Sequence, residues 1–145
     1  GSGGAQTTIY TLMFDFYAID SWRGNDSTSG PDKFEVYINS VNTFSHTFSN
    51  TTAGQSFRAP DVGPALLGYG ASAKDSIYRD ITIPFEIGSA PTMIIKWRSD
   101  GRTGINNESW GIDNVRISYN VVPAPGSLAL LALGGIAAGR RRRAA

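Results

Sequence analysis

The stretch TTIYTLMFDFYAI, residues 7–19, decides the fold class, because apolar and polar side chains alternate along it. The residues expected on its inner side are Leu12, Phe14, Phe16 and Ala18. Period-two patterning in a segment rich in aromatic and β-branched residues is typical of a strand with one buried face. We therefore expect residues 7–19 to form a strand of a half-buried sheet.

Similar patterning recurs along the chain in residues 34–38, 43–48, 77–87, 92–97 and 111–119. In the 77–87 segment, the residues expected on one face are Ile77, Arg79, Ile81, Ile83, Phe85 and Ile87. Pro84 cannot donate a ladder hydrogen bond, which predicts an edge position or a bulge there. Between residues 49 and 74 no period is sustained, and we expect one short strand. Six or seven strands without an amphipathic helix indicate an all-β, antiparallel β-sandwich.

Composition limits the possible functions. The 145 residues suffice for one domain, which we place at 1–120. Four of the thirteen basic residues form one run near the C-terminus, so the rest of the chain holds nine basic against twelve acidic residues. A nucleic-acid partner is not expected, because phosphate binding needs a basic surface. The absence of cysteine excludes disulfides and thiolate metal sites. If the chain is a fragment, a signal peptide and a leading strand precede residue 1 in the longer protein.

The C-terminal segment, residues 121–145, differs from the rest of the chain. Pro123 and Pro125 end the last strand, and residues 127–139 are uncharged and apolar. As a helix this run would reach only about 20 Å, against about 30 Å of bilayer hydrocarbon, so with residues 121–126 it is a minimal span. A helix that is apolar all round has no water-facing side, which favours a single membrane helix. The arginines that follow favour the cytoplasmic side and leave the β domain outside.

The order of these features resembles the PEP-CTERM sorting signal of Gram-negative bacteria. The residues that carry the resemblance are Val122, Pro123, Ala124 and Pro125, then the apolar run, then Arg140, Arg141, Arg142 and Arg143. Ala124 stands where this family usually has glutamate. The resemblance implies recognition by an exosortase, a temporary anchor in the inner membrane, and secretion to the cell surface or the extracellular matrix.

Two acidic clusters lie at expected strand ends, each beside a tryptophan: residues 20–32 and 107–114. Clustered carboxylate and amide oxygens suit Ca²⁺, which takes six to eight oxygen ligands. The candidate ligands are Asp20, Asp32, Glu108, Asp113 and Asn114. The alternative is that these residues only build turns, as Asp and Asn commonly do.

The stretch ESWGIDNVRIS, residues 108–118, resembles the closing strand of jelly-roll domains of the concanavalin-like, MAM-like and carbohydrate-binding-module kind. The resemblance implies a jelly-roll sandwich that binds polysaccharide, with Asp113 near a metal or fixing a loop. Aromatic residues beside polar loops are consistent with it, because their faces can stack on sugar rings. The candidate glycan-binding residues are Trp22, Trp110 and Tyr69.

Evidence for an enzyme is thin. His46 is the only histidine, and no nucleophile elbow, zinc ligand set or phosphate loop is present. Paired carboxylates, as in a glycan-processing hydrolase, remain a minor hypothesis. The favoured interpretation is a non-enzymatic surface or matrix module that binds polysaccharide. A structural matrix component without a small-ligand site is the alternative, and it gains if Trp22 and Trp110 are both buried.

Overall fold

The computed structural model of the protein describes residues 6–101 and 104–123. Seven strands form this part of the chain, and none of the described residues is helical. In chain order the strands are β1 (Thr7–Asp20), β2 (Lys33–Ile38), β3 (Val41–Thr47), β4 (Val62–Ala65), β5 (Asp75–Phe85), β6 (Ile95–Asp100) and β7 (Glu108–Val122).

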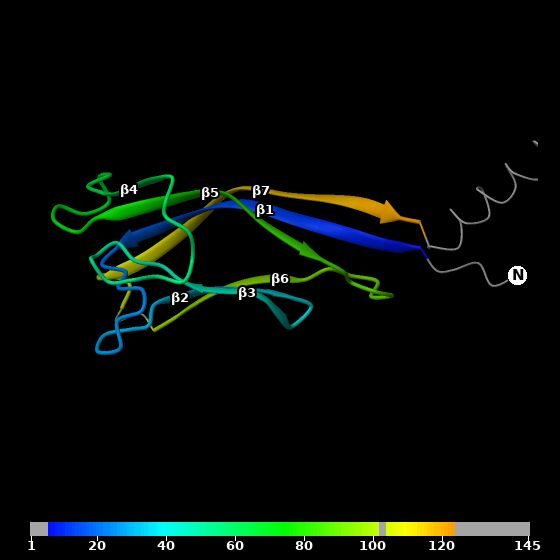
Figure 1. Ribbon diagram of the computed structural model, residues 1–145, viewed down its shortest axis with the longest axis horizontal. Helices are drawn as coiled ribbons and strands as arrows, with labels where there is room; N and C mark the ends of the chain where they lie inside the picture. Colours follow the sequence, from blue (N-terminus) through cyan, green and yellow to red (C-terminus); the bar gives the residue numbers. More distant parts are fainter. Residues whose placement is uncertain (1–5, 102–103, 124–145) are drawn as a thin grey trace, which may run out of the picture.

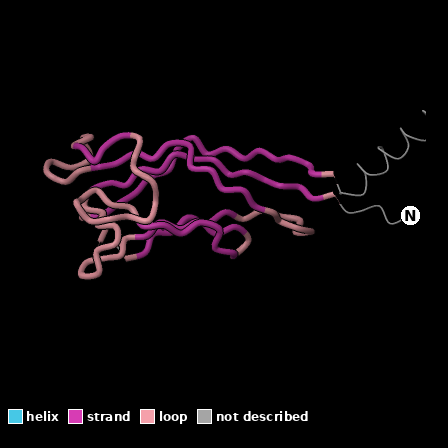
Figure 2. Tube along the Cα trace, viewed as in Figure 1, coloured by secondary structure: helices cyan, strands magenta, loops and turns pink. Residues whose placement is uncertain are grey.

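The strands form two antiparallel sheets that lie face to face (Figure 1). The first sheet has the order β4-β5-β1-β7 and the second has the order β3-β2-β6. Most loops gather at the end of the molecule where β1 finishes, which we call the loop end (Figure 2). The predicted all-β antiparallel sandwich is confirmed. Its jelly-roll type stays a prediction, and the expected C-terminal helix falls outside the described residues.

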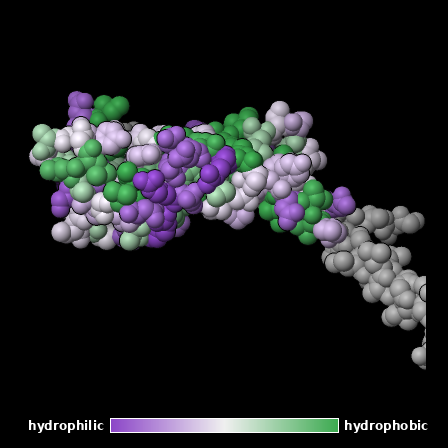
Figure 3. Space-filling model, turned by 90° about the horizontal axis from the view of Figure 1, so that it is seen from above, coloured by the Kyte–Doolittle hydropathy of each residue, from purple (hydrophilic) through white to green (hydrophobic). Residues whose placement is uncertain are grey.

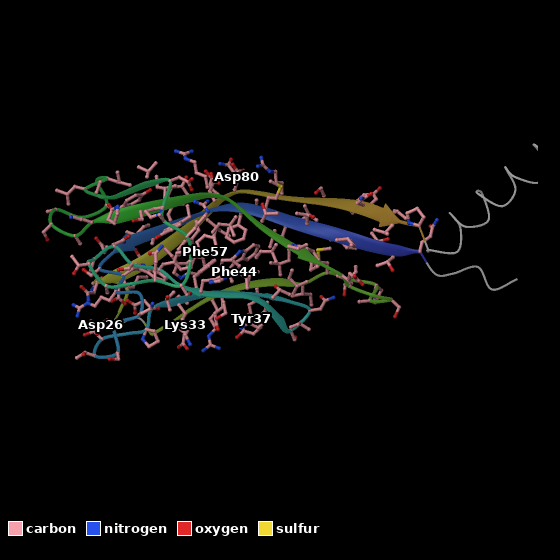
Figure 4. The ribbon with its side chains drawn as sticks, in the orientation of Figure 1. Asp26, Lys33, Tyr37, Phe44, Phe57 and Asp80 are labelled. Carbon is pink, nitrogen blue, oxygen red and sulfur yellow. The ribbon has the colours of Figure 1, made fainter. Side chains whose placement is uncertain are left out.

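The core fills the space between the two sheets. The predicted inner side of β1 is confirmed, since each of its four residues is at most 1% exposed: Leu12, Phe14, Phe16 and Ala18. Phe16 meets the second sheet directly, with its ring centroid 4.2 Å from that of Phe34. Phe44 and Phe57 also point between the layers, whereas Lys33 lies on the outer side of the second sheet (Figure 4). Alternation along β1 therefore decides which side chains are buried.

The predicted inner face of β5 is wrong in part. In β5 the inward side changes at Asp80, so that Tyr78 is buried while Ile77 is half-buried and Arg79 is exposed. Asp80 has a left-handed backbone conformation, with φ at 49°, where the register against β1 shifts. This bulge inserts one residue and reverses the alternation. Pro84 lies beyond the part of β5 that pairs with β4, which agrees with the predicted edge position.

Candidate functional site

Trp22 does not form an exposed binding platform. Its side chain is 0% exposed, and its ring packs against Phe16 and Phe48 at centroid distances of 5.6 and 6.3 Å. The indole Nε1–H donates a 2.7 Å hydrogen bond to the Ser109 carbonyl. The Asn50 backbone N–H in turn donates to the Trp22 carbonyl at 2.8 Å and holds the neighbouring loop over it. Trp22, a candidate glycan-binding residue, is therefore not exposed, because the polar loop folds back and turns its one large apolar side chain inward.

Trp110 is half-buried rather than free at the surface. Its ring lies 5.1 Å from that of Phe34 in an edge-on arrangement, and its Nε1–H donates to Ser99 Oγ at 3.0 Å. Tyr69 differs from both tryptophans, because 58% of its surface is exposed. Of the three aromatic candidates, Tyr69 alone presents most of its ring to solvent.

A polar groove crosses the loop end beside Tyr69. It consists of two cavities of about 460 and 340 Å³ that share Asp20, Ser21, Ser72 and Ala73. The first is also lined by Asn50, Thr51, Thr52, Pro64 and Lys74, and the second by Tyr69, Gly70, Ala71, Asn106 and Asn107. We call this depression the Asp20 groove. It joins Asp20, a predicted metal ligand, with Tyr69, a predicted glycan-binding residue.

Backbone hydrogen bonds fix Asp20 at the centre of this groove. Its N–H donates to Asp75 Oδ1 at 3.0 Å, and its carbonyl accepts a 2.6 Å bond from Asn50 Nδ2. A Cβ atom on Gly70 would lie 2.6 Å from Asp20 Oδ1, so a larger residue there would require the carboxylate to turn aside. No donor in the described part of the chain bonds this carboxylate, and Lys74 forms no ion pair there. Asp20 and Lys74 thus place one acidic and one basic side chain along the same groove.

Asp32 is buried beneath the same end of the molecule. Its side chain is 0% exposed; Oδ2 accepts a 2.5 Å bond from the Arg23 backbone N–H, while Oδ1 is buried without a partner. Burial raises the pKa of Asp32 to about 6, the Arg23 N–H opposes that rise, and the nearby Glu108 adds to it. Glu108 is also 0% exposed, so these two carboxyl groups do not face an open cleft as the catalytic pair of a hydrolase must.

Asp113 and Asn114 lie in a different place, where β7 passes Asp15 of β1. Asn114 has φ at 51° and forms a bulge, and its Nδ2 donates to Asp15 Oδ2 at 2.8 Å. From the other side, the Asp80 backbone N–H donates to Asp15 Oδ1 at 2.8 Å. Asp80 lies near the middle of the first sheet (Figure 4), and hydrophilic groups gather near the middle of that outer face (Figure 3). Asp15 therefore ties together the bulges of both neighbouring strands.

The five predicted calcium ligands do not come together in one site. Asp20 pairs with Glu108 across β1 and β7, and Asp32 lies near Glu108, but Asp113 is five residues further along β7. That separation corresponds to about 16 Å along a strand. Within residues 6–101 and 104–123, no three His, Cys, Asp or Glu side chains are grouped to hold a metal ion. Calcium binding stays a prediction.

The chain continues from β7 into its C-terminal segment. Residues 121–143 match the family model of the PEP-CTERM protein-sorting motif. This motif indicates a secreted protein that is sorted by an exosortase in Gram-negative bacteria. No curated protein and no solved structure matches the chain.

Most of the motif falls outside the described residues. Val122 ends β7 and Pro123 follows it, whereas Ala124, Pro125 and the arginines at 140–143 are not described. The part of the chain that is described contains no helix long and apolar enough to cross a membrane. The predicted membrane helix at 127–139 belongs to the segment that is not described.

Proposed function

We propose that the protein is an exosortase-sorted module whose β-sandwich binds extracellular polysaccharide in the Asp20 groove. The observation that carries this proposal is the position of the exposed Tyr69 in one groove with Lys74 and with the Asp20 carboxylate, which no described residue pairs. A carboxylate accepts hydrogen bonds from sugar hydroxyls, and an ammonium group donates to them. An aromatic ring supplies the apolar contact that a sugar ring needs. The groove thus offers both kinds of contact.

Substitutions in the groove test this proposal. Tyr69→Ala and Asp20→Asn are each expected to weaken polysaccharide binding about tenfold, which equals ~1.4 kcal/mol. Binding is measured as retarded migration in native gels cast with alginate or with hydroxyethylcellulose, one anionic and one neutral polymer. Leu66→Ala is the matched control, because Leu66 is 61% exposed and does not line the groove. Equal retardation of Tyr69→Ala and the unmodified protein would exclude the groove as the binding site.

Calcium binding at Asp32 is a second proposal, supported by the buried, unpartnered Oδ1. The pKa of Asp32 is raised to about 6 in the folded protein. Ionisation of Asp32 therefore lowers the free energy of unfolding as the pH rises from about 3.8 through 6. In chelator, Asp32→Asn is therefore expected to melt at a higher temperature than the unmodified protein at pH 7. Added Ca²⁺ should raise the melting temperature of the unmodified protein and leave that of Asp32→Asn unchanged. An equal response of both proteins to Ca²⁺ would place any ion elsewhere.

Processing of the C-terminal segment is the third part of the proposal. The arginine run at 140–143 is expected to hold that end of the segment on the cytoplasmic side until an exosortase cleaves it. Replacing all four arginines with glutamine should abolish the shortened, exported form, as followed by immunoblot of cell fractions. A host without its exosortase serves as the control. Normal export of the glutamine variant in the exosortase-bearing host would contradict this role.

A structural matrix component without a small-ligand site is the alternative function. The burial of Trp22 and the half-buried position of Trp110 favour it, because neither tryptophan offers a free face to a sugar. The same gels distinguish the two functions. Migration that no polymer retards would leave the structural function as the better interpretation.

A further inference from the structure

Strand β7 forms one edge of the first sheet. It pairs with β1 along nearly its whole length, and no strand in the described part of the chain pairs with its other side. An edge strand presents a row of free backbone N–H and C=O groups that can pair with another strand. At 15 residues, β7 is the longest strand in the described part of the chain.

The inward side of this edge is apolar but poorly covered. Every second residue from 115 to 121 is 42–71% exposed: Val115, Ile117, Tyr119 and Val121. We call these four residues the β7 strip. Ile117 lies opposite Leu12 of β1, so both side chains are on the same face of the first sheet. Leu12 is 0% exposed, whereas Ile117 is 46% exposed. The β7 strip is thus a continuation of the core face that remains open to solvent.

The lengths of the strands explain this exposure. β2, β3 and β6 have six or seven residues each, whereas β1 and β7 have 14 and 15. The two long strands extend together past the second sheet, to Thr7 at the start of β1 and Val122 at the end of β7 (Figure 1). Residues 115–122 include no proline or lysine, the residues that commonly protect an edge, and the Asn114 bulge lies before them.

We propose that β7 pairs antiparallel with β7 of a second copy of this chain, with the two-fold axis at Ser118. Apolar and polar residues alternate symmetrically about this position in the sequence VRISYNV, residues 115–121. In this register Ile117 faces Tyr119 of the second copy, and Val115 faces Val121 of the second copy. Such a pairing is self-complementary, as a two-fold interface requires. Apolar cross-strand pairs of this kind stabilise antiparallel sheets.

Charge also favours a second copy. Arg116 is the sole charged residue between positions 115 and 122, and it would face Asn120 of the second copy. No like charges therefore oppose one another across the pair. Arg116 is already ion-paired with Asp80 on its own chain. The dimer would contain one continuous eight-stranded sheet. This inference does not depend on polysaccharide binding.

Cysteine cross-linking tests the register, because the chain has no cysteine of its own. Ser118→Cys would place two thiols on the two-fold axis, with Cα atoms about 4.5–5.5 Å apart, within the range for a disulfide. Asn120→Cys is the matched control, since its two copies would be offset by about 14 Å. With the full chain in mild detergent and a mild oxidant, we expect Ser118→Cys to form the disulfide-linked dimer at least about tenfold faster.

A second substitution tests the β7 strip itself. Ile117→Lys in the Ser118→Cys protein is expected to abolish the dimer, whereas Ile94→Lys, at a residue 66% exposed outside the strip, should not. Circular dichroism confirms that both variants remain folded. Equal cross-linking at positions 118 and 120, or none at either, would overturn the proposal. Cross-linking that survives Ile117→Lys in a folded protein would also overturn it and leave another occupant, such as residues 124–145, for the strip.

Discussion

Replacing Trp22 with alanine is expected to lower the free energy of unfolding by about 3–5 kcal/mol. The side chain is fully buried between Phe16 and Phe48, so its removal leaves a cavity that the surrounding rings cannot fill without moving. It also leaves the Ser109 carbonyl without the indole donor. Since domains are commonly stable by only about 5–15 kcal/mol, this variant should be close to unfolding. Urea denaturation followed by circular dichroism measures the loss.

Two further variants separate packing from hydrogen bonding at this position. Trp22→Phe keeps an aromatic ring but loses the Nε1–H donor. We expect it to lower the free energy of unfolding by less than the alanine substitution does. Tyr69→Ala removes an exposed ring and should change stability by no more than about 0.5 kcal/mol. A small effect of Trp22→Ala, equal to that of Tyr69→Ala, would contradict the buried position of Trp22.

Alternation predicted the strands well where one face is buried without interruption, as in β1. It failed in β5, where Ile77 and Arg79 were expected inward, because the bulge at Asp80 reverses the faces. The structure shows this reversal directly, since the buried residues Tyr78 and Ile81 are three positions apart, a spacing that a regular strand with period two does not allow.

The site was predictable only in part. Asp20 and Tyr69 were each selected for the chemistry of their side chains, but 49 positions separate them and no pattern in the intervening loops predicts that they share a groove. Trp22 was misplaced because the residues around it are polar, and local composition does not show which way a loop side chain turns. The acidic candidates were divided between two places because β7 is one long strand that carries Glu108 and Asp113 far apart.

Asp15→Ala is expected to destabilise the protein by about 3 kcal/mol, because two partly buried hydrogen bonds lose their charged acceptor. The carboxylate is 4% exposed and accepts hydrogen bonds from Asn114 Nδ2 and from the Asp80 backbone N–H. Without it, the bulges of β7 and β5 are no longer tied to β1. The loss should therefore appear as a lower urea midpoint and as faster hydrogen exchange in both neighbouring strands.

The same carboxylate predicts how stability depends on pH. Burial by itself would raise the pKa of Asp15, but the bonds from Asn114 and Asp80, with Arg79 and Arg116 nearby, bring it below its usual value. Its contribution to stability is therefore complete above the unfolded value of about 3.8 and is lost as the pH falls through the lower folded value. Asp15→Asn should be less stable at pH 7 and should lose less stability than the unmodified protein on acidification. Asp100→Asn, at an exposed carboxylate, is the control. If Asp15→Asn loses as much stability as the unmodified protein on acidification, other carboxylates cause that loss.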